Sequence, residues 1–395
     1  MSNEWAVERD QSHSISMPGR PSRLLSRGLR HLDRSRRLID LGTLGGQNSW
    51  ASDINGAGQV AGWSDTATED THAFMWERRC LHNLSTLGGS SSRAVAINSQ
   101  GQVVGTCRDS NGNERAFLWD DGVMRDLGLD PATIIRGATQ TWPDGSVDYL
   151  GQPHDASLEV NDINDAGEVI GWICLSYWEK PNHVGGVGFR WESNSLTLLD
   201  ILPVATNNAR HIVGIRWPWA PEIGQWPAVQ IHSEYPIESV DPTDGGRIPD
   251  DVSATNDRGQ VVGHDLGLNS NTEDNPAYIL EPGSRTYTEL GFLAQEHSFS
   301  AAMGINNVGQ VVGWSGPDHG EGGKIRVQPF LWESGQIHPL ESRVSSGDGF
   351  ARPLAAEHRS NPTNYDLYNL EINDHGQIVG TLLTRSGNHH AFLIE

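Results

Sequence analysis

The sequence predicts an all-β fold, a seven-bladed β-propeller with four-stranded blades. The first observation behind this prediction is a nine-residue motif, INSQGQVVG at 97–105 and INNVGQVVG at 305–313, which recurs in seven variants. The second is that each copy is followed by further short apolar segments in a fixed order. The third is that the final copy lacks its last segment, while a spare segment of that kind precedes the first copy. A chain with 45 Gly, 14 Trp and only 20% charged residues also suits turn-rich β structure.

Each copy is anchored on an Asn that ends a first apolar strand. In the pattern Asn-x-x-Gly, the Asn begins a tight turn and the Gly takes the left-handed position that closes a hairpin. A second strand of the QVVGW type follows, then a third of the HAFLW type and a fourth of the DLGTLGG type. Four short antiparallel strands at a base period of about 43 residues are typical of propeller blades, whereas helical solenoids need a 3.6-residue pattern. The anchors are Asn55, Asn98, Asn164, Asn207, Asn256, Asn306 and Asn373.

The fourth copy departs from this pattern. In ATNNARHIVGI (205–215), Arg210 stands where the other six hairpins have Gly. If the turn is shared, Arg210 adopts a strained left-handed conformation, and Arg210→Gly stabilises the protein by about 1 kcal/mol.

The two ends of the repeat region complement each other. The chain stops at HHAFLIE (389–395), a third-strand segment, and LIDLGTLGG (38–46) is an isolated fourth-strand segment. We therefore expect residues 38–46 to pair with the C-terminal blade and close the ring, which leaves no open sheet edge. The propeller domain then spans residues 38–395. Residues 1–37 carry eight Arg against four acidic residues and are predicted to form a disordered Arg-rich tail.

The order DLGTLGG, Ser, Ile-Asn, GQVVG and HAFLW resembles the HAF repeat, a bacterial repeat class named after its His-Ala-Phe, which occurs here at 72–74 and 390–392. The resemblance covers residues 38–395. It implies a repeat fold, with no general activity and no catalytic residues to carry over, so His72 and His390 are interpreted as structural. The class is often thought extracellular, but no apolar stretch of a secretory signal follows the N-terminal Arg residues here, which indicates the cytoplasm.

Composition narrows the classes of partner and cofactor. A net charge of −22 argues against nucleic acid and against acidic membrane surfaces. No stretch approaches the length of a membrane span, and Cys80, Cys107 and Cys174 form no disulfide framework. The His residues lack metal-ligand spacing, and phosphate-loop, Cys-x-x-Cys and Gly-x-Ser-x-Gly motifs are missing. We expect a monomer without metal or cofactor.

Insertions in the loops between the predicted strands indicate where the functional site lies. They fall between the fourth and first strands (roughly 129–157 and 341–368) and between the second and third, so all rise from one face, where functional loops concentrate. At the channel mouth on that face, the position five residues before the anchor holds seven different residues: Trp50, Arg93, Glu159, Leu202, Asp251, Ala301 and Tyr368. The position eight residues after it includes Trp172 and His264, and His154 and His297 precede first strands.

These positions predict an aromatic pocket with convergent polar groups. The candidate catalytic residues are Glu159, His154, Asp251 and Tyr368, with Glu159 leading because an apolar environment would raise its pKa toward neutrality. The candidate substrate-binding residues are Trp50, Arg93, Trp172, Trp217, His264 and His297.

Two classes of function remain open. The first is binding of a small apolar or partly oxygenated organic molecule, with turnover by a cofactor-free cyclase, isomerase or lyase that needs only shape and proton transfer. The second is a propeller-type platform for protein–protein interaction without catalysis. Aromatic, non-repeating loops favour the first class, and the missing stock catalytic motifs favour the second.

Overall fold

A computed structural model describes most of the chain from Arg36 to Glu395. All described residues belong to one compact unit, Ser35–Glu395. The predicted Arg-rich tail lies outside the described residues except for Arg36 and Arg37. The described residues are 36–134, 139–141, 147–149, 155–176, 184–199, 201–216, 228–232, 238–239, 251–264, 274–284, 286–317, 324–344, 350, 354, 356–359 and 369–395.

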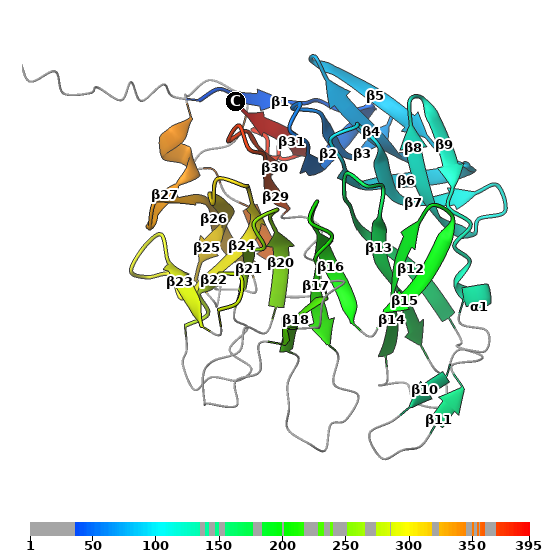
Figure 1. The fold of residues 1–395 in the computed structure, drawn as a ribbon. Helices are drawn as coiled ribbons and strands as arrows, with labels where there is room; N and C mark the ends of the chain where they lie inside the picture. The colour runs from blue at the N-terminus through cyan, green and yellow to red at the C-terminus, as the bar shows by residue number, and fades with distance from the viewer. Residues whose placement is uncertain are drawn as a thin grey trace, which may run out of the picture. The chain divides into compact units, whose positions relative to one another are not determined.

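The prediction of an all-β fold is confirmed: most described strands follow one another in antiparallel groups of four (Figure 1). The first two groups are joined into one eight-stranded sheet by a single parallel pair, Thr71 with Ser91. The first four groups are β2 (Gly45–Ile54), β3 (Val60–Thr66), β4 (Thr71–Glu77) and β5 (Cys80–Ser85); β6 (Gly88–Ile97), β7 (Val103–Asp109), β8 (Glu114–Asp120) and β9 (Val123–Asp126); β12 (Asp155–Ile163), β13 (Val169–Ser176), β14 (Val184–Glu192) and β15 (Ser195–Leu199); and β16 (Leu202–Thr206), β17 (Ile212–Arg216), β18 (Ala228–His232) and β19 (Glu238–Ser239).

The later groups follow the same order until the last, which takes its fourth strand from the start of the chain. They are β20 (Asp251–Thr255), β21 (Val261–His264), β22 (Ala277–Leu280) and β23 (Tyr287–Gly291); β24 (Phe299–Ile305), β25 (Val311–Gly316), β26 (Lys324–Glu333) and β27 (Gln336–Pro339); and β29 (Leu370–Ile372), β30 (Ile378–Leu383), β31 (His389–Ile394) and β1 (Leu38–Asp40).

Few described elements lie outside these groups. The hairpin β10 (Thr139–Thr141) and β11 (Val147–Tyr149), the single helical turn α1 (Pro131–Ile134) and the 3-10 turn Leu340–Arg343 belong to connections. The strand β28 (Ala356–Arg359) pairs with the beginning of β26, so two of the predicted insertions meet as strands. No helix among the described residues is long and apolar enough to cross a membrane.

The anchor Asn uses its whole side-chain amide in the hairpin turn. Asn55 Oδ1 accepts hydrogen bonds from the backbone N–H groups of Ala57 and Gln59, each at 3.0 Å. Its Nδ2 donates to Gln59 Oε1 at 2.7 Å and to the carbonyl of Asn98, the next anchor, at 3.0 Å. Asp could not make these two donations, which explains why the motif keeps Asn at this buried position.

The same donation to the next anchor recurs from group to group. Each anchor Nδ2 bonds the carbonyl of the following anchor at 2.7–3.2 Å, and Asn373 bonds the carbonyl of Asn55 at 3.0 Å. The series of seven bonds therefore returns to its first member.

Hydrophobic clusters lie between consecutive groups rather than within one. Phe117 of β8 packs in one cluster with Ala73 of β4, for example, and Phe330 of β26 packs in another with Ile279 of β22. One cluster joins Val379 and Leu393 of the last group to Phe74 of the first. Burial of apolar surface thus holds the first and last groups together in the same way as the other neighbours.

The isolated N-terminal strand pairs with the C-terminal strand. Residues Leu38–Asp40 lie antiparallel to β31, with Leu38 opposite Ile394. Residues 45–46 instead begin β2, so the pairing covers only the first part of the predicted 38–46 segment. Arg37, which the prediction assigned to the tail, exchanges backbone hydrogen bonds with Glu395 at 2.9 and 3.0 Å. The sheet unit therefore begins before residue 38.

Arg210 adopts the left-handed conformation of the glycines it replaces, with φ of 65°. Its N–H bonds the carbonyl of Asn207 at 2.9 Å, as Gly58 bonds Asn55, so the turn is shared. The side chain has a role of its own: Arg210 Nη2 lies 3.0 Å from an oxygen of Glu168, a fully buried carboxylate. Glu168 stands where five of the seven copies, including that of Gln59, have Gln. The expectation that Arg210→Gly stabilises the protein is therefore revised, because the substitution would also break this ion pair.

Candidate functional site

A cavity of about 760 Å³ lies between the first strands of the groups, and we call it the first-strand cavity. Its wall comes from β2, β6, β12, β16, β20, β24 and β29 and from the anchor Asn turns. The turn end of the cavity carries the residues that follow the anchors, such as Asp165, Asp257 and Asp374. The opposite end, which we call the Arg93 end, carries Trp63, Arg93, Thr106 and Glu159. Such a volume suits a small organic molecule.

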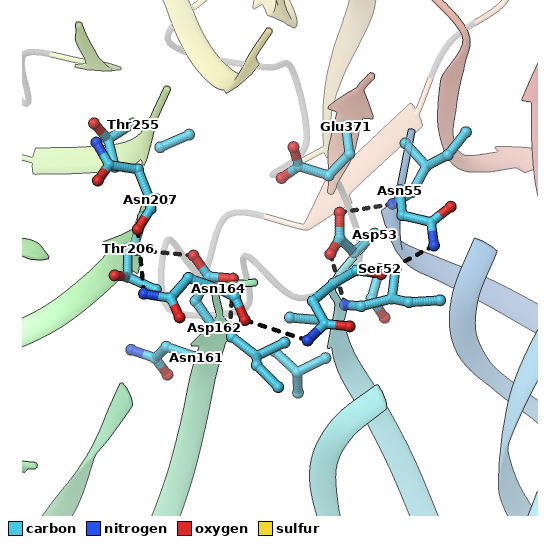
Figure 2. A pocket seen from close by; sticks show the side chains of 18 of the residues that line it. Ser52, Asp53, Asn55, Asn161, Asp162, Asn164, Thr206, Asn207, Thr255 and Glu371 are labelled. Atoms are coloured by element: carbon cyan, nitrogen blue, oxygen red, sulfur yellow. Dashed lines mark hydrogen bonds between the residues drawn. The ribbon is translucent and has the colours of Figure 1, made fainter. Parts of the chain in front are cut away.

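Three carboxyl groups face the cavity from the position two residues before an anchor (Figure 2). We call Asp53, Asp162 and Glu371 the carboxyl trio. The four other groups have Ala96, Ala205, Ala254 and Gly304 there. Small residues at four places and acids at three leave space in the cavity and concentrate negative charge on its wall.

Asp53 and Asp162 each connect neighbouring groups. Asp53 accepts hydrogen bonds from the backbone N–H of Ile54 at 2.6 Å and from that of Ile97, in the next group, at 2.8 Å. Asp162 accepts the equivalent bonds from Ile163 at 2.7 Å and Thr206 at 2.8 Å (Figure 2). Both carboxyls are therefore held rigidly with one edge toward the cavity.

Glu371 has a different environment. Its side chain lies at the cavity wall, and among the described residues no hydrogen-bond donor contacts it (Figure 2). It extends toward Gly304, where an added Cβ would lie 2.5 Å from Glu371 Oε2. The glycine of the sixth copy therefore provides space for this carboxyl.

The environment raises the pKa of all three carboxyls. Burial raises the pKa of Asp53 to about 6, against the opposing effect of its two backbone hydrogen bonds. Burial raises the pKa of Asp162 to about 7, and the negative charge of Asp53 adds to the effect. Burial also raises the pKa of Glu371 well above its ordinary value, with further contributions from Asp53 and Asp162. Proton-transfer groups that work at neutral pH need pKa values in this range.

We expect the trio to make stability depend on pH. The native state holds these protons at pH values where the unfolded chain has lost them, so the free energy of unfolding falls as pH rises from about 4 to about 7. Glu371→Gln should leave the free energy of unfolding at pH 4 nearly unchanged and raise it at pH 8. The gain at pH 8 is about 1.4 kcal/mol for each unit by which folding raises the pKa of Glu371. Urea unfolding at several pH values measures this. Asp121→Asn, at an exposed turn, is the control, and an unchanged pH slope in Glu371→Gln would contradict the assignment.

Two of the predicted site residues line the cavity at its Arg93 end. Glu159 is exposed and pairs in register with Trp172 on β13. Arg93 is also exposed, and its guanidinium lies 5.8 Å from the centre of the Trp63 ring in a cation–π contact. The structure thus brings an acidic side chain, a guanidinium and an aromatic ring to one end of the cavity.

Two residues of the predicted aromatic walls, Trp50 and Trp172, are described, and neither is among the described lining residues. Trp50 stacks between Trp63, at 5.7 Å, and His389, at 6.4 Å, and lies behind Trp63 rather than on the cavity wall. Trp172 packs over Gly186, where an added Cβ would lie 2.9 Å from its ring. Among the described lining residues Trp63 alone is aromatic, so the cavity is more polar than the sequence suggested.

The remaining predicted residues lie elsewhere. Asp251 and His264 pair in register across β20 and β21, with 3.7 Å between a carboxylate oxygen and His264 Nε2, and neither is among the described lining residues. Burial raises the pKa of Asp251, and His264 opposes this effect. His297 Nδ1 lies 2.9 Å from the Ser315 hydroxyl, also away from the cavity wall. Three further predicted residues fall outside the described part of the chain: His154, Trp217 and Tyr368.

Sequence reasoning missed the carboxyl trio, although the signal was present. The letters before the anchors read DIN, AIN, DIN, ATN, ATN, GIN and EIN, so three acids interrupt a series of small residues. Among the described residues, no three His, Cys, Asp or Glu side chains gather closely enough to hold a metal ion.

Comparisons with known proteins bear on the fold alone. No protein-family model and no curated protein sequence matches this chain. Among solved structures, the chain is similar to oligogalacturonate lyase from Vibrio parahaemolyticus, with a TM-score of 0.52 and 10% identity over 91% of this chain and 93% of that chain. It is also similar to the β-propeller domain of the Trilobed protease from Pyrococcus furiosus, with a TM-score of 0.46 and 12% identity over 73% of this chain and 82% of that one. The second of these neighbours is a β-propeller domain.

Proposed function

We propose that the four-strand groups are the blades of one closed seven-bladed β-propeller, and that its channel, the first-strand cavity, binds a small organic molecule. Two observations support ring closure: the anchor bonds return from Asn373 to Asn55, and a hydrophobic cluster joins the last group to the first. The repeat letters that make these contacts also support membership of residues 38–395 in the HAF-repeat class.

One observation carries the functional proposal: a cavity of about 760 Å³ contains carboxyl groups whose pKa values lie near neutrality. A large exposed apolar patch would instead mark a protein-interaction platform. Among the described residues, the exposed large apolar side chains are only Val123, Leu196, Leu198 and Val308. The small-molecule function is therefore favoured over the platform.

The chemistry that such a cavity supports is proton transfer without a cofactor. A carboxyl with a pKa of about 7, such as that of Asp162, is present in both protonation states at neutral pH and can give or take a proton. Asp53, with a pKa of about 6, is more often ionised and suits the base. We assign proton transfer to Asp162 and Asp53 in place of Glu159. The reaction class is isomerisation, elimination or cyclisation, with Arg93 and Glu159 orienting the ligand.

The proposal includes a cytoplasmic monomer that works without nucleic-acid or membrane partners, and the net charge of −22 supports the last two points.

The test is a thermal-shift screen of neutral, cationic and anionic small organic molecules, followed by calorimetry on the compounds that bind. We expect Asp162→Asn and Arg93→Ala each to weaken binding or turnover at least tenfold. Asp121→Asn is the matched control, because it makes the same acid-to-amide change at an exposed turn. If Asp162→Asn and Arg93→Ala bind every compound as tightly as the unaltered protein does, the ligand site is not in this cavity.

A further inference from the structure

The charges that line the first-strand cavity are strongly unbalanced. Its described acids are the carboxyl trio, Glu159 at the Arg93 end, and Asp165, Asp257 and Asp374 at the turn end. Arg93 is the one Lys, Arg or His among the described lining residues, and it lies beside Trp63 at one end. The deep part of the cavity therefore has carboxyl groups and no described basic side chain to neutralise them.

The acids at the turn end are already engaged in hydrogen bonds with the protein. Asp165 Oδ1 accepts a hydrogen bond from the N–H of Ser99 at 2.8 Å, and Asp257 Oδ1 accepts one from the N–H of Asn208 at 2.8 Å. Asp374 accepts two from Asn307, at 2.7 and 3.1 Å. These carboxylates bond one turn to the next at one end of the cavity, and Glu159 lies at the other end, so the trio supplies the acids of the deep part.

Within the trio, Glu371 has the fewest hydrogen-bond donors from the protein, so a bound ligand would stabilise its carboxylate most. Asp53 and Asp162 each accept two backbone hydrogen bonds, whereas no described donor contacts Glu371, which the cavity desolvates. A desolvated carboxyl without a hydrogen-bond donor is stable only when it is protonated or when a cation binds beside it. The Glu371 carboxyl lies against Gly304, where an added Cβ would lie 2.5 Å from Oε2.

We infer that the ligand of the first-strand cavity is an organic cation, a molecule with a protonated amine that binds between Glu371, Asp53 and Asp162. This inference rests on the proposed small-molecule function and specifies the chemical class of the ligand. A volume of about 760 Å³ accommodates an amine with a carbon skeleton rather than a bare ion. The ammonium donates hydrogen bonds to Glu371, and the neighbouring carboxylates supply the opposite charge. The Trp63–Arg93 pair is left to contact the rest of the molecule.

Binding of such a cation should release protons. In the free protein burial raises the pKa values of the trio, so these carboxyls keep protons at pH values where ordinary carboxyls have lost them. An ammonium group would favour the ionised carboxylates and displace those protons. A neutral or anionic ligand would not have this effect.

The experiment uses isothermal titration calorimetry with three four-carbon probes of matched length: 1,4-diaminobutane, 1,4-butanediol and succinate. We expect the diamine to bind at least tenfold more tightly than the other two at pH 7. We also expect its apparent binding enthalpy to change with the ionisation enthalpy of the buffer, which measures proton release. Glu371→Gln should weaken diamine binding at least tenfold, while Asp121→Asn should leave it within twofold.

Several outcomes would overturn the inference. They are equal or tighter binding of the diol or succinate, diamine binding without proton release, and diamine binding that Glu371→Gln does not alter. The buffer dependence requires only the unaltered protein, so the inference remains falsifiable if Glu371→Gln fails to fold. If succinate or the diol binds and Asp162→Asn weakens that binding, the cation inference fails while the proposed function stands. If no compound of the wider screen responds to Asp162→Asn or Arg93→Ala, the proposed function fails as well.

Discussion

Deletion of residues 1–46 lowers the free energy of unfolding by about 4 kcal/mol or more, whereas deletion of residues 1–34 changes it by less than about 1 kcal/mol. The longer deletion removes β1 from β31 and leaves the backbone groups of that strand unpaired along one edge. It also removes Leu38 and Leu41, which are 5% and 6% exposed, and each buried Leu typically contributes about 2–5 kcal/mol. The shorter deletion leaves Arg36 and Arg37, with their backbone bonds, in place.

Urea unfolding of the three chains, followed by Trp fluorescence, measures these differences. The shorter deletion is the control for loss of the Arg-rich segment itself. Equal stability of the two truncated chains would mean that residues 38–46 do not hold the last group to the first, and the proposed ring closure would then fail.

The fold was predictable because the residues at equivalent positions of the repeats make the same contact in one group after another. Asn55 and its equivalents bond the next anchor, and Ser92 Oγ accepts a hydrogen bond from the N–H of Ala73 in the preceding group, as Ser300 does from Ala277. A residue that must make one contact in seven copies recurs in the sequence, and recurrence can be recognised without a structure. The extent of the N-terminal pairing was less predictable, because residues 45–46 suit either strand.

The site was less predictable, for a geometric reason. In β2 the register shifts between Ala51 and Asp53, so Trp50 lies opposite Trp63 while Asp53 lies opposite Ala61. This bulge puts residues three apart on the same face, whereas a regular strand alternates faces at every residue. Glu159 and Asp162 are related in the same way on β12. Sequence reasoning therefore found Glu159 at the end of the cavity but not Asp162 on its wall.

The deviation of the fourth copy is understandable only in three dimensions. The sequence shows two separate substitutions, Glu168 for Gln in the third copy and Arg210 for Gly in the fourth. Glu168 is fully buried and pairs with Arg210 at 3.0 Å and with Arg190 at 3.6 Å. Between five other pairs of groups a Gln of one group lies beside the Gly of the next, as Gln59 lies beside Gly101, and His211 lies beside Gly259 in the remaining pair. The two substitutions thus replace one contact between groups by an ion pair.

Arg210→Gly is therefore expected to lower the free energy of unfolding by about 2 kcal/mol. Loss of one partner from a buried ion pair costs about 3–5 kcal/mol, and release of the left-handed strain at Arg210 offsets about 1 kcal/mol, while Arg190 continues to screen Glu168.

The double variant Glu168→Gln with Arg210→Gly restores the Gln and Gly of the repeat, so its stability should return to within about 1 kcal/mol of the unaltered protein. Glu168→Gln alone leaves Arg210 without its main partner and should be destabilising, though less than Arg210→Gly, because Arg210 is partly exposed and keeps Glu192 at 2.5 Å. Urea unfolding of the four chains at pH 7 yields the coupling energy directly. A gain in stability for Arg210→Gly alone, or additive effects of the two substitutions, would show that the pair does not replace the repeat contact.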